Sequence, residues 1–321
     1  MTDLGIVAPP VGAFTARPSW VAAPQSLRRG VCEALGSDEV DSVDVHGGMS
    51  PGPAAVLSLA DGRRVFVKAV SAAVGAGSHE LYGWEAVALE AMSLGVPAPE
   101  LLAVVLDGDW LALVTSWVPG ATAGPPWTSA AFASVLDACD RVAEHRAPAA
   151  VPPVIDRLPD LDGWAKLATA SDGIVDEWDS RHARRLAELV EGWRDWTAGP
   201  WLSHHDVRCD NAIIDSHTGR ATLVDWSYAS AGPSWLDRAL LSADVMGSGH
   251  EHGVVMALND AMSALASAPD AASRFVIGLA GMWRCNSTLP PHPGLPTHRA
   301  WQSARAAALR PLVSELMTRL S

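Results

Sequence analysis

The sequence predicts an α+β fold, with a small β-rich part near the N-terminus and a larger helical part after it. Between about residues 40 and 116, short apolar runs are separated by turn residues, which is typical of strands. From about residue 128 onward, apolar residues mostly recur with a helical period. A β-hairpin interrupts these helices, because the apolar runs Ala212–Ile214 and Ala221–Val224 flank the turn segment Asp215–Gly219.

The N-terminal part is expected to begin with an extended lead-in over residues 1–24, which is rich in Ala, Pro and Val without a period. Residues 24–35 predict a short helix that ends at Gly36, a residue type common at helix C-termini. Strands are expected next, with the turn Ala60–Gly62 joining the second and third: Ser42–His46, Ala54–Leu59, Arg64–Val70, Leu101–Leu106 and Trp110–Ser116.

The best helical pattern in this part runs from Ser78 to Leu94. At about 100° per residue, Glu85 lies in the middle of an apolar face made of Leu81, Trp84, Ala88, Leu89 and Met92. A carboxylate in such a face needs a cationic partner. The pattern therefore predicts a buried ion pair at Glu85.

The segment Trp117–Gly120 breaks the strand pattern and is interpreted as a hinge between the two parts. Beyond it, helices are expected over residues 128–146, 157–170, 180–197, 234–246, 250–267, 270–285 and 299–320.

Composition limits the function classes. The chain has 321 residues, of which 49% are hydrophobic and 18% charged, as in ordinary globular proteins. A net charge of −13 argues against nucleic-acid or anionic-membrane partners, which need a basic surface. The four cysteines show no CxxC pairing, no apolar run approaches the length of a membrane span, and no signal-peptide pattern is present. These features predict a cytoplasmic protein with no membrane and no nucleic-acid partner.

Oxygen-bearing side chains lie on both sides of the expected hairpin. His204, Asp206 and Asn211 precede its first strand in a His-x-Asp-x-x-x-x-Asn arrangement, and Asp225 follows its second strand. Kinase-type phosphotransferases place one base and two metal ligands around a γ-phosphate in this way. Magnesium prefers oxygen ligands in near-octahedral geometry, so this spacing indicates phosphoryl-transfer chemistry.

The chain resembles the aminoglycoside phosphotransferase and choline kinase-like family over about residues 25–240. Besides the groups above, the resemblance is carried by Gly232-Pro233-x-Trp235-x-Asp237 and by upstream segments in the family's order: Gly47–Gly52, Val65–Lys68, Glu85, Gly95–Pro99 and Ser116–Gly120. It implies a bilobal protein-kinase-like fold. The nucleotide-binding lobe would span residues 25–116, and the helical lobe with the catalytic loop and substrate site would span residues 117–321.

The resemblance also implies roles around the reacting phosphate. Asp206 would be the catalytic base that accepts a hydrogen bond from the substrate hydroxyl. Asn211 and Asp225 would bind one or two Mg²⁺ ions that bridge the β- and γ-phosphates. Arg208 would hold the γ-phosphate, or it would form a structural ion pair with Asp210; both interpretations stay open.

Further residues are expected to hold the nucleotide, ATP or GTP. Lys68 would bind the α- and β-phosphates, with Glu85 as its ion-pair partner. The backbone of the hinge at Ser116, Trp117 and Val118 would hydrogen-bond the purine edge. Backbone N–H groups of a glycine loop would cover the phosphates, with Gly47, Gly48, Ser50 and Gly52 as its key positions. The same loop fits the nucleophile elbow of α/β-hydrolases, but Pro51 has no N–H to donate to an oxyanion, and a strand rather than a helix follows.

The acceptor site is expected to include Asp206, Trp283 and Trp301, since the family builds that site from this part of the chain. The sequence thus predicts a nucleotide-dependent small-molecule O-phosphotransferase, with an antibiotic hydroxyl as the favoured acceptor. The alternatives are a metabolic kinase of a sugar, choline or amino alcohol, and a nucleotide-binding pseudokinase.

Overall fold

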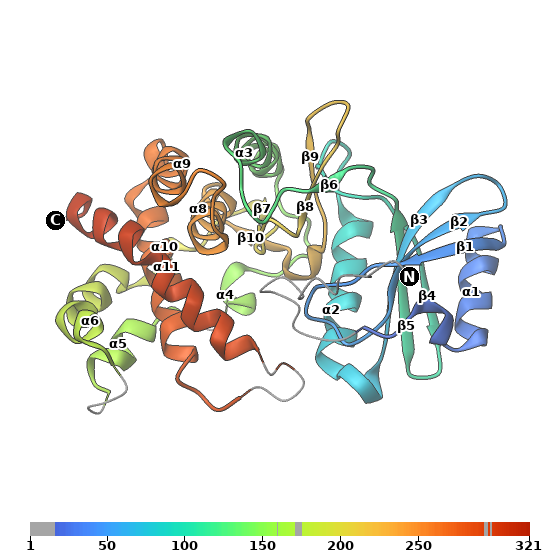
Figure 1. Ribbon diagram of the computed structural model, residues 1–321, viewed down its shortest axis with the longest axis horizontal. Helices are drawn as coiled ribbons and strands as arrows, with labels where there is room; N and C mark the ends of the chain where they lie inside the picture. The colour runs from blue at the N-terminus through green and yellow to red at the C-terminus, as the bar shows by residue number, and fades with distance from the viewer. Residues whose placement is uncertain (1–16, 159, 171–174, 292–294, 296) are drawn as a thin grey trace, which may run out of the picture.

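A computed structural model describes residues 17–158, 160–170, 175–291, 295 and 297–321. It has a β-sheet at the N-terminal end and helices at the C-terminal end, which confirms the predicted α+β kinase-like architecture (Figure 1). The C-terminus lies at the end of the molecule opposite the sheet.

The N-terminal part contains a five-stranded antiparallel sheet in the order β1-β2-β3-β5-β4. Its strands are β1 (Glu39–Asp44), β2 (Ala54–Leu59), β3 (Arg64–Ser71), β4 (Leu101–Asp107) and β5 (Trp110–Ser116). The turn between β2 and β3 falls at the predicted position, with Gly62 at φ 88°, a conformation that glycine adopts without strain. The first strand begins three residues earlier than expected, and the other four lie within one residue of their predicted ends.

Helix α1 (Gln25–Leu35) ends at Gly36, whose φ of 65° gives the left-handed C-terminal geometry predicted from the sequence. It packs against β4 and β5 on one face of the sheet and buries Leu27 and Val31 there. Helix α2 (Ala72–Ala91) packs against β3, β4 and β5 on the side that faces the C-terminal part (Figure 1).

The predicted bounds of α2 are wrong, because the helix spans Ala72–Ala91 rather than Ser78–Leu94. The hydroxyl of Ser71 accepts a hydrogen bond from the N–H of Ala73, which caps a first turn that the apolar pattern did not indicate. The backbone at Gly75 is non-helical, so the helix consists of two merged pieces. Extended geometry at Met92 ends it before Gly95.

The lead-in is also more structured than expected in the part that the structure describes. Residues Trp20–Ala22 form a 3-10 turn, and the side chain of Trp20 is fully buried. Its N–H donates to Asp44 Oδ1 at 2.8 Å and its indole donates to Glu39 Oε2 at 2.9 Å. The segment is therefore part of the sheet's core, whereas residues 1–16 of the predicted lead-in lie outside the described residues.

The C-terminal part carries two small antiparallel sheets. The first contains β6 (Ala121–Thr122), β8 (Ala212–Ile214) and β9 (Ala221–Leu223), and β8 and β9 form the predicted hairpin. The second pairs β7 (Trp201–Ser203) with β10 (Ser230–Gly232). A short 3-10 helix, η2 (Trp226–Tyr228), follows β9 and contacts α2.

Helices form the rest of this part: α3 (Ser129–Ala143), α4 (Val154–Arg157), α5 (Gly163–Ala168), α6 (Glu177–Val190), α7 (Trp193–Trp196), α8 (Leu236–Ser248), α9 (Val254–Ala266), α10 (Asp270–Asn286) and α11 (His298–Arg319). The single helix expected over residues 157–170 is wrong. Leu158, which precedes a proline in the sequence, is extended, because a following proline disfavours helical geometry. The helix expected over 180–197 is likewise divided, at Gly192 with φ 74°.

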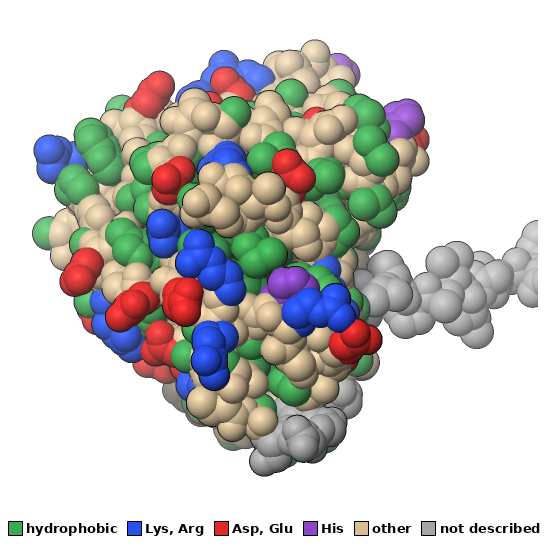
Figure 2. Space-filling model, turned by 90° about the vertical axis from the view of Figure 1, so that its left-hand side faces the viewer, with side chains coloured by type: hydrophobic (Ala, Val, Ile, Leu, Met, Phe, Trp, Pro, Cys, Tyr) green, Lys and Arg blue, Asp and Glu red, His purple; other side chains and the backbone are tan. Residues whose placement is uncertain are grey.

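The described part of the chain has no helix long and apolar enough to cross a membrane. On the face formed by the C-terminal end, acidic and basic side chains are interspersed among hydrophobic and other side chains (Figure 2). The net charge of −13 is therefore not gathered into one acidic region on that face.

Candidate active site

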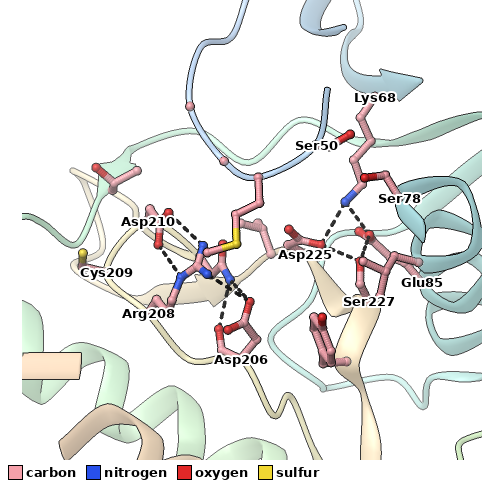
Figure 3. Close-up of a pocket in the computed structure, with 18 of the residues that line it drawn as sticks. Ser50, Lys68, Ser78, Glu85, Asp206, Arg208, Cys209, Asp210, Asp225 and Ser227 are labelled. Atoms are coloured by element: carbon pink, nitrogen blue, oxygen red, sulfur yellow. Dashed lines mark hydrogen bonds and ion pairs between the residues drawn. The ribbon is translucent and has the colours of Figure 1, made fainter. Parts of the chain in front are cut away.

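Lys68 is the centre of an ion-pair cluster between the two parts of the molecule (Figure 3). Its Nζ lies 2.5 Å from Glu85 Oε2 on α2 and 3.0 Å from Asp225 Oδ1 just after β9. The side chains of Lys68 and Glu85 are only 7% and 3% exposed. The cation also lies 4.6 Å from the ring centroid of Tyr82, a favourable cation–π contact. The buried partner that Glu85 was expected to need is therefore present.

Charge states in this cluster follow from burial and pairing. Burial opposes the charge on Lys68, but Asp225 and Glu85 outweigh it and raise the pKa of the ammonium. Burial also opposes ionisation of Asp225, but the attraction of Lys68 and a hydrogen bond from Ser227 outweigh it, so its pKa is lowered. For Glu85, burial dominates and the pKa is raised. The cluster therefore holds a charged lysine facing an ionised Asp225.

Ser227 is a member of this cluster that the sequence analysis missed. Its hydroxyl lies 2.7 Å from Asp225 Oδ1 and 3.0 Å from Glu85 Oε2. A single hydroxyl proton serves one of these carboxylates at a time, so Ser227 connects the two without charge of its own. The only signal in the sequence is its position two residues after Asp225.

Asp237 holds the loop that precedes the β8–β9 hairpin by hydrogen bonds to its backbone. Its two carboxylate oxygens accept the backbone N–H groups of His204 at 2.8 Å and His205 at 2.9 Å. The buried imidazole of His204 donates from Nε2 to the carbonyl of Val224 at 2.9 Å, and its Nδ1 accepts the N–H of Asp206 at 3.2 Å. Burial lowers the pKa of His204 to about 4, so the ring is neutral, as this tautomer requires.

Asp206 lies at the end of this braced loop with its carboxylate partly exposed to the cleft. Asn211 Nδ2 donates to its Oδ2 at 2.9 Å and to its carbonyl oxygen at 3.0 Å. Burial raises the pKa of Asp206 to about 7, and the positive charge of Arg208 offsets part of the rise. A carboxylate with a pKa near 7 exchanges a proton readily at neutral pH.

Arg208 forms the structural ion pair that was one of its two expected roles. Its Nε and NH2 groups donate to the two carboxylate oxygens of Asp210, each at 3.0 Å, in a bidentate arrangement (Figure 3). Its NH1 atom lies 3.6 Å from Asp206 Oδ2. The guanidinium thus lies between the two carboxylates, at the edge of the cleft.

Asn211 and Asp225 bring oxygen atoms to the same stretch of the cleft. Because the amide nitrogen of Asn211 is hydrogen-bonded to Asp206, its carbonyl oxygen is the atom left for a cation. Asp225 is held at φ 65°, a left-handed conformation that directs a side chain away from a regular strand. Among the described residues no three His, Cys, Asp or Glu side chains form a metal cluster. A magnesium site here would therefore consist of these two oxygens completed by phosphate oxygens and water, which is how Mg²⁺ commonly binds.

The glycine loop between β1 and β2 lies over this cluster and is held by Arg17, which the sequence analysis missed. Arg17 Nε donates to the carbonyl of Gly47 at 2.5 Å, and its NH1 donates to that of Gly52 at 3.0 Å. Gly48 has φ 76°, and a Cβ there would lie 2.7 Å from Arg17 NH2. At Gly52 a Cβ would lie 1.8 Å from the carbonyl oxygen of Ala69, so only glycine permits this approach to β3.

The expected hinge leaves the sheet at the end of β5. The N–H of Ser116 donates to the carbonyl of Glu100 at 2.9 Å, and its hydroxyl accepts the N–H of Glu100 at 2.9 Å. The hydroxyl of Ser116 thus fixes the start of β4. Trp117 is covered by the guanidinium of Arg64, 4.9 Å from its ring centroid, and the backbone continues past Val118 along the cleft.

One cleft of about 1520 Å³ contacts nearly all of these groups. Of the residues predicted for the site, only Gly52 is not part of its wall; the others are Gly47, Gly48, Ser50, Lys68, Glu85, Ser116, Trp117, Val118, Asp206, Arg208, Asn211, Asp225, Trp283 and Trp301. The two tryptophans lie on α10 and α11, with ring centroids 5.5 Å apart and nearly perpendicular planes. The structure thus brings the predicted residues together, and their individual roles remain predictions.

Comparison with known proteins agrees with this arrangement. A family described as "Phosphotransferase enzyme family" matches residues 56–270, whereas no curated protein matches the chain. Among solved structures, an amicoumacin kinase in complex with AMP-PNP, Ca²⁺ and Ami is similar with a TM-score of 0.52 and 14% identity, covering 87% of this chain and 88% of that one. An ethanolamine kinase of Plasmodium vivax has a TM-score of 0.53 and 11% identity, covering 86% of this chain and 84% of that one. At such identities the solved structures establish the fold alone. The family match extends over more than half of the chain, and the protein therefore belongs to the phosphotransferase enzyme family, as a kinase-type enzyme whose acceptor is an alcohol group.

Proposed function

We propose that the protein transfers the γ-phosphate of ATP or GTP to a hydroxyl group of a small molecule, with an antibiotic as the favoured acceptor. One observation carries the proposal: Lys68 on the sheet contacts Glu85 on α2 and Asp225 after the hairpin, across one cleft. Lys68, a cation that can bind phosphates, is thereby adjacent to Asp225, whose carboxylate oxygens can bind a metal. The similar amicoumacin kinase, whose structure contains AMP-PNP, supports a nucleotide as donor.

In this proposal the nucleotide lies under the glycine loop, with its base at the hinge of Ser116, Trp117 and Val118. Lys68 contacts the α- and β-phosphates, and Glu85 keeps the ammonium in place. Backbone N–H groups of residues 47–52 cover the phosphates, and Arg17 fixes the loop that presents them. When bound, Mg²⁺ on Asn211 and Asp225 would neutralise charge on the β- and γ-phosphates.

Asp206 is the proposed base. The acceptor hydroxyl oxygen forms the new bond to the γ-phosphorus while the bond from that phosphorus to the bridging oxygen of the diphosphate breaks. The hydroxyl proton moves to the carboxylate of Asp206, whose pKa of about 7 suits the acceptance and later release of a proton. Asn211 orients this carboxylate through the hydrogen bond at 2.9 Å. Arg208 supplies positive charge beside the transferring group.

The test is a measurement of phosphate transfer with the full chain. Magnesium and ATP or GTP are offered with a library of hydroxyl-bearing antibiotics, common sugars and amino alcohols, and mass spectrometry detects a product heavier by one phosphate. Asp206→Ala is expected to slow product formation by about 10²–10⁴-fold while nucleotide binding is retained. The matched control is Asp195→Ala, an exposed carboxylate on α7 outside the cleft. Nucleotide binding with neither product from any acceptor nor slow hydrolysis of the nucleotide would refute the proposal in favour of a pseudokinase.

A further inference from the structure

The carboxylates that line the cleft lie at one end of it. Among the described lining residues they are Glu85, Asp206, Asp210 and Asp225. Each lies within 4 Å of Lys68 or Arg208. Their negative charge is therefore already balanced by cations of the protein or committed to the phosphoryl-transfer centre. None of them is left to bind a positively charged acceptor.

The part of the cleft that is lined by the end of α4 and by α10 and α11 is apolar and basic. Its apolar wall includes Leu158, Phe275, Leu279, Met282, Trp283 and Trp301. The charged side chains described there are Arg157, Arg299 and Arg305. Arg305 is neutralised by the buried Asp244 at 2.5 Å, whereas no described carboxylate lies within ion-pair distance of Arg157 or Arg299. Glu80 and Asp156 act on Arg157 only from a longer range, so neither Arg157 nor Arg299 is paired with a described carboxylate in direct contact.

Arg157 is the best placed of these cations. It is the last residue of α4, and its guanidinium lies over the ring of Trp84, 3.4 Å from the centroid. Its Nε is buried without a hydrogen-bond partner. Stacking fixes the plane of a guanidinium but leaves its edge N–H groups available, and these donate in the geometry that a carboxylate accepts.

The charge of Arg157 also reaches the catalytic loop. Burial, together with the charges of His204 and Arg157, lowers the pKa of His205 to about 4. Arg157, Tyr228 and Asp206 line the same cleft, and Tyr228 is within electrostatic range of Asp206 and, more weakly, of Arg157. A small molecule that contacts Arg157 can therefore present a hydroxyl near Asp206.

We propose that the acceptor carries an anionic group that binds Arg157, and an apolar, ring-bearing body that packs against Trp283 and Trp301. This inference rests on the proposed phosphotransfer and narrows its substrate class. Although the whole chain is acidic, polycationic hydroxyl compounds do not match the charges of this cleft. Specificity here comes from repulsion of cations as well as from attraction of anions.

The test uses three probes of one shape and different charge: 4-(hydroxymethyl)benzoate, 4-(hydroxymethyl)benzamide and 4-(hydroxymethyl)benzylamine. Phosphorylation of each by the full chain with magnesium nucleotide is measured as kcat/KM. The wild type is expected to prefer the carboxylate to the amide by about tenfold, equivalent to about 1.4 kcal/mol, and to disfavour the ammonium. Slow hydrolysis of the nucleotide by water is measured in parallel, because it reports on the transfer centre without any acceptor.

Variants then assign the preference to one side chain. Arg157→Gln is expected to lower the ratio of kcat/KM for the carboxylate over the amide by about tenfold, whereas the KM for nucleotide changes less than about twofold. Arg157→Lys keeps the charge but loses the bidentate fork, and it should retain part of the preference. Arg220→Gln, an exposed arginine outside the cleft, is the matched control and should leave all three rates unchanged.

Each outcome decides between defined alternatives. Hydrolysis with no preference for the carboxylate probe overturns the inference and leaves the proposed function intact. Equal losses on all three probes with a raised KM for nucleotide also overturn it, and make Arg157 a brace between α4 and Trp84. Absence of both nucleotide binding and hydrolysis refutes the proposed function and, with it, this substrate class.

Discussion

The buried pair of Lys68 and Glu85 allows a quantitative test of the site. Replacement of Lys68 by Met leaves Glu85 and Asp225 without their cation, and a buried ion that loses its partner costs about 3–5 kcal/mol. Replacement of Glu85 by Leu costs less, because Asp225 still pairs with the ammonium at 3.0 Å. In the double variant most of this penalty disappears, because no carboxylate is left at position 85 without its cation. We therefore expect a coupling free energy of about 2 kcal/mol between the two positions.

The measurement is a double-mutant cycle in urea, with the free energy of unfolding of the wild type, Lys68→Met, Glu85→Leu and the double variant. Nucleotide binding is followed in parallel and should be lost in Lys68→Met and weakened in Glu85→Leu. Arg181→Met, which removes an arginine from an exposed i,i+4 pair with Glu177 on α6, is the control and should cost less than about 1 kcal/mol. Additive effects at positions 68 and 85 would refute the argument that the pair acts as a buried unit.

Further predictions concern the catalytic loop and the glycine loop. Asp206→Ala should lower kcat by about 10²–10⁴-fold, measured with any accepted substrate, with the Kd for nucleotide changed by less than about threefold. In the wild type kcat/KM should rise with pH up to about 7 and then level off, because the base acts in its ionised form and its pKa is raised to about 7; the residual rate of Asp206→Ala should lack this inflexion. Asp237→Asn should cost about 1–3 kcal/mol in urea unfolding, since an amide oxygen cannot accept both N–H groups of His204 and His205 with the charge of a carboxylate. Burial raises the pKa of Asp237 to about 6, so its native form binds more protons than its unfolded form between the ordinary carboxyl value and 6; the unfolding free energy of the wild type relative to this variant should therefore fall as pH rises through that window. Arg17→Ala should raise the KM for nucleotide about fivefold through loss of the two hydrogen bonds to the glycine loop, and an unchanged KM would exclude Arg17 from loop positioning.

The sequence was sufficient to predict features that a local pattern or one unfavourable side-chain environment determines. Glu85 in an apolar helical face required a cation, and a lysine at the end of an alternating strand could supply it. The hairpin over residues 212–223 and the left-handed C-terminus of α1 at Gly36 follow from short-range turn chemistry in the same way. These features are local or involve one strongly constrained partner.

Other features depended on contacts that no local pattern specifies. Arg17 binds carbonyl groups 30 and 35 residues away. Because every residue has a backbone carbonyl, the sequence does not indicate which carbonyls an arginine will bind. Ser227 acquires its place from the fold of η2 against α2, which only the assembled cleft defines. Arg157 ends α4, whereas the sequence analysis placed it at the start of a helix over residues 157–170, so its contact with Trp84 was not foreseeable.

The arrangement of charges explains how one site can be both stable without ligand and ready to bind a highly charged nucleotide. Lys68 is held by Asp225, and Arg208 by Asp210, so each cation that the proposed mechanism directs at a phosphate is first paired with a carboxylate. In the proposed mechanism, binding of a magnesium nucleotide would exchange partners rather than bury new isolated charge. The phosphates would pair with the two cations, and Asp225 would be available to hold the metal. Because the desolvation of these ions has already occurred in the folded protein, the exchange avoids most of the cost of creating a charged site at the moment of binding. Asp206, which has Arg208 at 3.6 Å and no closer cation among the described residues, is the one carboxylate left to act as a base.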